Sequence, residues 1–239
     1  MIPMPWIPSL WRRFWGRPWA VGPPAHDGPA EGGDRQGEAV VGAQEAAVAD
    51  PATHTPDYSL MADSLAVARS QIGVRERPPG SNSGPEVDRY LRSVGRQPGD
   101  PWCLALVYWC IQQAWIRKHG GWDEYEGAPP VPFPRTACTP RIWSWAQQQG
   151  PDYWVSPADV FLGRDVPDGA LFLLHGKVGE IERVNHVGFV EHLNLADQVV
   201  RTVEGNTNPA GSREGGAVLR RERRLGGCAG SRCTGSDRS

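Results

Sequence analysis

Two hydrophobic patterns divide the central part of the chain, residues 57–225. Up to residue 149, apolar side chains recur at helical spacing and predict helices over 59–72, 86–94, 102–116 and 140–149. From residue 169 on, apolar and polar residues alternate and predict strands over 169–175, 185–192, 198–204 and 216–224. Helices followed by strands indicate an α+β domain with an antiparallel sheet.

The segments on either side of this domain lack such patterns. Residues 1–56 are rich in proline and glycine, so we expect a leader that buries no core. Tryptophan and arginine dominate its beginning, and a short helix there would resemble an interfacial anchor. Prolines limit that helix to about two turns, and we favour an unstructured leader. We predict no signal peptide, because no continuous apolar core precedes a small-residue cleavage site, and we expect 226–239 to be a flexible polar tail.

Composition narrows the classes of function. The formal net charge of -2 argues against a nucleic-acid binder that relies on a global basic field. No stretch approaches the roughly 18 consecutive apolar residues of a membrane span. Five cysteines cannot all pair with one another, so at least one thiol is free. Cys228 and Cys233 lack the matching His or Cys pair that a zinc site needs, and we expect a monomer without a cofactor.

Cys103 is the first candidate for chemistry. It follows a Gly-Asp-Pro-Trp loop and opens the most apolar predicted helix. The partial positive charge of a helix N-terminus stabilises a thiolate, and the free N–H groups there can hold an oxyanion. A buried core cysteine is the alternative, which suits Cys110, two turns further along the same face, better.

His186 and Glu204 are the candidate partners of this thiol. Imidazole is the usual base for a thiol, and Gly188, two residues further along the strand, leaves room for a neighbouring backbone or a ligand. A hairpin centred near residue 195 would pair His186 with Glu204, so that the carboxylate fixes the tautomer of the ring. His192 shares the strand and its face but lies about 20 Å away, and the register selects His186. A satisfied core histidine and a plain turn at 204–208 are the alternatives.

The sequence resembles the CHAP domain, the cysteine- and histidine-dependent amidohydrolase/peptidase of the papain-like group that cuts bacterial cell-wall peptides. The resemblance covers about residues 66–225. It rests on ARSQIGVRE, SNSGPEVDRYL, PWCLALVYWC, HVGFVE and EGNTN, followed by a basic strand, in the order of the family. It implies a papain-like fold in which the cysteine helix packs against the sheet. It also implies Cys103 as nucleophile, His186 as base, Glu204 as orienting acid and Asn206 as a further polar partner of the histidine or the oxyanion.

The resemblance implies a substrate as well. The thiol would attack an amide of peptidoglycan, as an endopeptidase or an N-acetylmuramoyl-L-alanine amidase. Four residues would line the cleft, although core packing or turn formation explains them equally well: Trp102, Trp109, Asn82 and Ser81. Some relatives bind calcium through an acidic loop, but here that loop carries only Asp100, so no metal is predicted.

Two alternatives to a peptidoglycan hydrolase stay open. The first is a catalytically silent wall-binding or structural module that keeps the fold. The second is a papain-like hydrolase that acts on another amide substrate. For the peptidoglycan hydrolase we expect a bacterial or phage-derived enzyme, which would act in the periplasm or the cell wall if it is delivered there.

Overall fold

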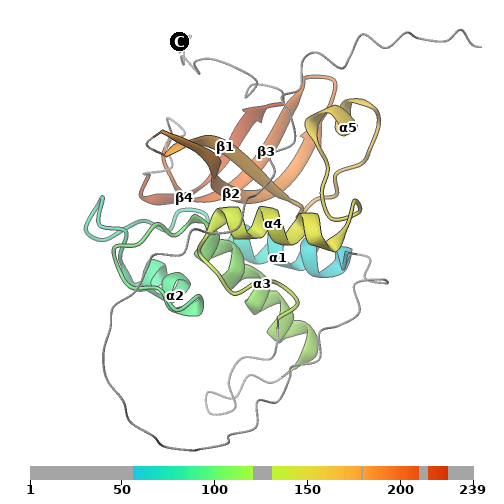
Figure 1. Cartoon of the computed structure of the whole chain (residues 1–239). Coiled ribbons are helices and arrows are strands. Elements are labelled where there is room, and N and C mark those ends of the chain that lie inside the picture. Colours follow the sequence, from blue (N-terminus) through green and yellow to red (C-terminus); the bar gives the residue numbers. More distant parts are fainter. Residues whose placement is uncertain (1–55, 121–130, 179, 210–214, 226–239) are drawn as a thin grey trace, which may run out of the picture. The chain divides into compact units, whose positions relative to one another are not determined.

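The computed structural model describes residues 56–120, 131–178, 180–209 and 215–225, all within one compact unit, Ala49–Ser239. Its helices are α1 (Tyr58–Ser70), α2 (Pro85–Ser93), α3 (Cys103–His119), α4 (Thr139–Gln149) and α5 (Pro157–Phe161). Its strands are β1 (Leu171–Val178), β2 (Ile181–Asn194), β3 (Val199–Thr207) and β4 (Ala217–Arg224). The predicted α+β class with an antiparallel sheet is confirmed (Figure 1).

The predicted elements all occur, with small shifts at their ends. Helix α3 begins at Cys103, one residue after the predicted start, and continues to His119, three residues beyond the predicted end. Helix α5 was not predicted because five residues give no hydrophobic period. Its signal is local: Ser156 caps the helix and exchanges hydrogen bonds with Asp159 in a capping box, next to a proline in the first turn. The leader, the tail, and Cys228 and Cys233 lie outside the described residues.

The four strands form a meander in the order β1-β2-β3-β4, every neighbouring pair antiparallel. Strands β2 and β3 pair with Phe189 opposite Val203 and Val190 opposite Thr202, and a bulge follows before His192. Pairing about residue 195 is therefore wrong by two residues at Phe189 and Val203. Next to the turn, where Asn194 pairs with Val199, it is wrong by three residues, and the bulge removes one of them. On the side of the bulge that holds the site, the shift of two residues keeps His186 and Glu204 on one face of the sheet.

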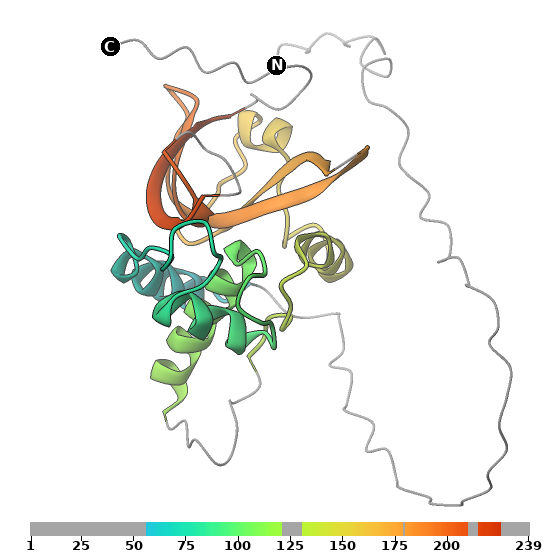
Figure 2. The same cartoon turned by 90° about the vertical axis from the view of Figure 1, so that its left-hand side faces the viewer.

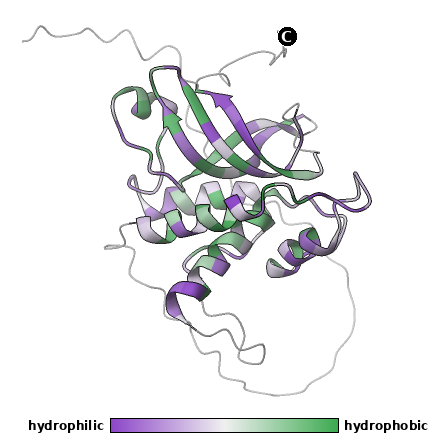
Figure 3. Ribbon diagram, turned by 180° about the vertical axis from the view of Figure 1, so that it is seen from behind, coloured by the Kyte–Doolittle hydropathy of each residue, from purple (hydrophilic) through white to green (hydrophobic). Residues whose placement is uncertain are grey.

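Helices α1, α3 and α4 lie on one side of the sheet, which is strongly curved (Figures 1 and 2). Buried residues of α3 share one core with Val187 and Phe189 of β2 and Val203 of β3. Hydrophobic residues gather where the central helices meet the strands (Figure 3). At Gly205, a Cβ atom would lie 2.6 Å from Leu106 Cδ2 and 2.7 Å from the Trp102 ring. This glycine lets β3 approach the start of α3 closely.

Within the described ranges, no helix combines the length and apolarity that crossing a bilayer requires.

Candidate active site

Cys103 is the first residue of α3 and retains 6% of its surface exposed. The first N–H groups of a helix have no partner within it, so they point from this turn toward whatever approaches the thiol. Cys110, two turns further, is fully buried, and burial raises the pKa of its thiol far above the ordinary range. Only one of these two cysteines is therefore placed for chemistry.

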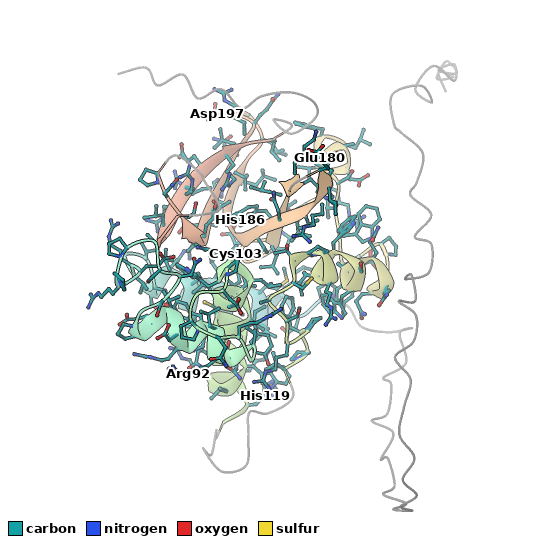
Figure 4. The ribbon with its side chains drawn as sticks, turned by 60° about the vertical axis from the view of Figure 1, so that its left-hand side comes forward. Arg92, Cys103, His119, Glu180, His186 and Asp197 are labelled. Atoms are coloured by element: carbon teal, nitrogen blue, oxygen red, sulfur yellow. The ribbon has the colours of Figure 1, made fainter. Side chains whose placement is uncertain are left out.

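His186 of β2 brings its imidazole next to this thiol (Figure 4). Its Nε2 lies 2.9 Å from Glu204 Oε2, and the residue is 2% exposed. Nδ1 is buried without a hydrogen-bond partner among the described residues, and Cys103 is a close neighbour that stays outside hydrogen-bonding geometry. The ring is thus held at one nitrogen and open at the other.

Glu204 of β3 is the most enclosed member of the group, with no exposed surface. Its Oε1 accepts from the hydroxyl of Thr202 and from Nε of Arg223 at 2.6 Å. Its Oε2 accepts from Nη2 of Arg223 and faces the imidazole of His186. A carboxylate buried in this way requires compensating partners, and here both oxygens have them.

Charge coupling is visible in the pKa values of this pair. Burial alone would lower the pKa of His186, but the neighbouring Cys103 and Glu204 side chains outweigh it and raise the pKa to about 9. Burial alone would raise the pKa of Glu204, but hydrogen bonds from His186, Arg223 and Thr202 and the charge of Arg223 lower it. Carboxylate and imidazolium therefore stabilise each other's charged forms.

Gly188 explains how His186 and Glu204 meet although they are not directly opposed. The register places Glu204 across from Gly188, so the carboxylate reaches His186 diagonally. A Cβ atom at Gly188 would lie 2.7 Å from the Phe172 ring and 3.0 Å from Glu204 Cγ. The room that the sequence predicts beside this glycine is therefore filled by these two side chains.

Asn206 does not bond to the histidine, one of the two partners predicted for it, and its role toward an oxyanion stays a prediction. Its Oδ1 accepts from the Trp102 backbone N–H at 3.2 Å, and its Nδ2 donates to Asn82 Oδ1 and to the Gly215 carbonyl, each at 3.0 Å. Both amide hydrogens are thus engaged away from the imidazole, because the backbone of Asn206 is left-handed (φ 55°) and turns the side chain toward α3. Asn206 instead ties β3 to the residue before Cys103.

The residues expected to line a cleft have mixed positions. Trp102 is fully buried, stacks near Tyr90 and donates Nε1 to Glu76 at 2.8 Å, so its predicted contact with substrate is wrong. Trp109 is partly buried and packs against the core. Asn82 (φ 49°) accepts from Asn206 and donates to the Gly99 carbonyl, so it joins two loops next to α3. Ser81 lies beside it, partly exposed, and its hydroxyl donates a long hydrogen bond of 3.5 Å to the Ser83 carbonyl.

The sequence reasoning missed Thr202 and Arg223. Thr202 precedes Glu204 by two residues and therefore shares its face of the strand, a signal that the period of two contained. Arg223 carries no such signal, because it pairs with Val200 and reaches Glu204 only through the curvature of the sheet. Its guanidinium also lies 5.4 Å from the centre of the Phe172 ring, so side chains from both edge strands meet here.

The described ranges contain no group of three or more His, Cys, Asp or Glu side chains that could bind a metal ion. Asp100, in the loop before α3, lies 3.9 Å from Arg96.

Comparisons of the chain with family models, with curated proteins and with solved structures found no match.

Proposed function

We propose that this protein is a cysteine-dependent hydrolase that cleaves amide bonds in peptidoglycan peptides, with the papain-like arrangement of a CHAP domain. One observation carries the proposal. A thiol at the start of α3, an imidazole on β2 and a carboxylate on β3 are neighbours in space, in that order. Along the chain, 83 residues separate Cys103 from His186. A nucleophile, its base and the group that orients the base are the three parts of covalent amide hydrolysis.

The geometry supports a specific division of roles. Glu204 accepts a hydrogen bond from the Nε2–H group of His186, which leaves Nδ1 as the nitrogen that can take the proton of Cys103. The sulfur then bonds to the amide carbonyl carbon, and the N–H groups at the start of α3 stabilise the resulting oxyanion. The C–N bond breaks as His186 returns the proton to the leaving amine. Water, deprotonated by the same imidazole, then releases the acyl group and restores the thiol.

The choice of substrate rests on the resemblance to the CHAP domain, and the catalytic step rests on the site. Both can be tested with purified peptidoglycan by mass spectrometry of the released fragments. New amino termini on alanine or on a bridge residue identify an endopeptidase, whereas free lactyl-muramyl ends identify an amidase. We expect one of these products from the native chain.

The matched variants are Cys103→Ala and Cys138→Ala. Cys138 is a free, partly exposed thiol that precedes α4, so its loss should leave cleavage unchanged. Cys103→Ala should abolish cleavage while circular dichroism stays native. Binding of peptidoglycan by both variants, without cleavage by the native chain, would instead identify a catalytically silent module. Cleavage that survives in Cys103→Ala would exclude the thiol mechanism.

A further inference from the structure

Besides His186 and Thr202, Glu204 has a third partner, the cation Arg223. The proposed arrangement of nucleophile, base and orienting acid does not require it. Arg223 makes two parallel hydrogen bonds to the carboxylate and keeps only 17% of its side chain exposed. Its guanidinium also stacks on Phe172, whose ring centre is 6.1 Å from that of His186. Such a fork-like pair fixes both the position and the plane of a carboxylate, which a single ammonium group cannot do.

The buried carboxylate poses an electrostatic problem for a general base. When the imidazole gives up its proton, an unassisted Glu204 would remain as a lone negative charge without exposed surface. That cost would hold the proton on His186 and prevent the ring from accepting another from a thiol. A permanent counter-charge on the carboxylate removes the cost, because an arginine stays protonated throughout.

We propose that Arg223 is a positioning residue of the site: it supplies this permanent counter-charge and so allows His186 to alternate between its neutral and charged forms. The role rests on the proposed hydrolase function. The other charged or titratable groups that face the pair are Cys103 of α3 and Arg221 of β4. Arg221 donates to the Asn208 carbonyl and not to the carboxylate, so Arg223 is the cation that acts on Glu204 directly.

The test separates charge from hydrogen bonding with two substitutions, Arg223→Gln and Arg223→Lys. Glutamine keeps a donor but loses the charge, whereas lysine keeps the charge but loses the fork. The titration of His186 is followed by NMR of its ring protons, assigned against His186→Gln among the six histidines. This measurement needs no substrate, so it stands or fails separately from peptidoglycan cleavage.

We expect Arg223→Gln to raise the titration midpoint of His186 by about one pH unit. Without the arginine, deprotonation of the His186 ring would leave the negative charge of Glu204 with no positive partner. In the same variant, the pH at which activity rises as His186 loses its proton should increase by a similar amount. Arg223→Lys should keep the native midpoint. Arg224→Met, an exposed neighbour on β4, is the matched control and should leave both measurements unchanged.

Three results would overturn the inference: a native midpoint in Arg223→Gln, a downward shift in it, or equal shifts in the glutamine and lysine variants. If Arg223→Gln does not fold, the double variant Arg223→Gln with Glu204→Gln becomes decisive. Removal of both charges leaves no buried ion without a partner, so this variant should fold. Failure of the double variant as well would show that Arg223 acts through packing and not through charge.

Discussion

Two buried glutamates of the sheet, Glu191 of β2 and Glu204 of β3, are both paired with arginine but differ in their other partners. Glu191 joins Arg69 of α1 at 2.7 Å and Arg220 of β4 at 2.9 Å, and both arginine side chains are about half exposed. Glu204 has one arginine, and its other charged neighbour is a buried imidazole. The first carboxylate links a helix to a strand through groups that keep their charge. The second shares its charge with a group that can lose a proton beside a thiol.

The largest expected difference between the two regions is in turnover. His186→Ala should reduce cleavage of peptidoglycan by at least about a thousandfold, because the base is lost. Arg220→Met, which removes one partner of Glu191, should leave turnover within about twofold of native. Initial rates for folded variants measure both effects. Native turnover in His186→Ala would remove the functional distinction between the two glutamates.

The second difference separates activity from stability. Glu204→Gln should lower turnover about a hundredfold, less than loss of the imidazole, because the carboxylate only orients and stabilises the ring. Glu191→Gln should keep turnover but lower the free energy of unfolding by about 1–2 kcal/mol, since its three hydrogen bonds from two half-exposed arginines lose the negative charge of the acceptor. Urea unfolding and initial rates give the two quantities. Equal losses of activity in both variants would contradict the comparison.

The smallest expected difference is in the pH dependence of stability. The pKa of His186 is raised from 6.5 to about 9, so its contribution is full below pH 6.5 and is lost as the pH rises through about 9. The pKa of Glu191 is lowered by Arg220 and Arg69, so its contribution is present above its ordinary value of 4.5 and is lost in acid. Glu204, also lowered, shares this acid loss.

Urea unfolding of the native chain, His186→Gln and Glu191→Gln across the pH range measures these contributions. The stability gap between native chain and His186→Gln should narrow between pH 6.5 and 9. The gap to Glu191→Gln should narrow only below pH 4.5. A gap to His186→Gln that widened with alkaline pH would show that the ring is neutral in the folded protein.

Much of the fold follows from local hydrophobic patterns. Much of the site follows from the alternation of side chains between the two faces of a strand. The apolar run after Pro101 is long enough to predict α3, and the alternation from residue 169 on predicts the strands. His186 and Glu204 were paired through a register that is wrong by two residues, yet both side chains still point to one face. A register error of two residues does not change the face to which a side chain points, because the side-chain period of a strand is two.

The remaining features depend on three-dimensional relations that no local pattern contains. Arg223 reaches Glu204 because the sheet curves, and curvature is a property of several strands together. Trp102 was expected beside a substrate, but the close approach of Gly205 buries its ring in the core. Asn206 was predicted to be a partner of the histidine or of the oxyanion, but a left-handed backbone turns it away from the imidazole and toward the Trp102 N–H. A single residue with unusual backbone angles redirects its side chain, and the hydrophobic pattern of the sequence does not reveal this.

The order of the elements along the chain has a consequence for biosynthesis. The thiol belongs to α3, whereas its base, its acid and Arg223 belong to β2, β3 and β4. A nascent polypeptide that has emerged only as far as α4 therefore carries a cysteine without any partner to activate it. Cys103, His186 and Glu204 come together only after β2 has paired with β3, and Arg223 joins them when β4 pairs with β3.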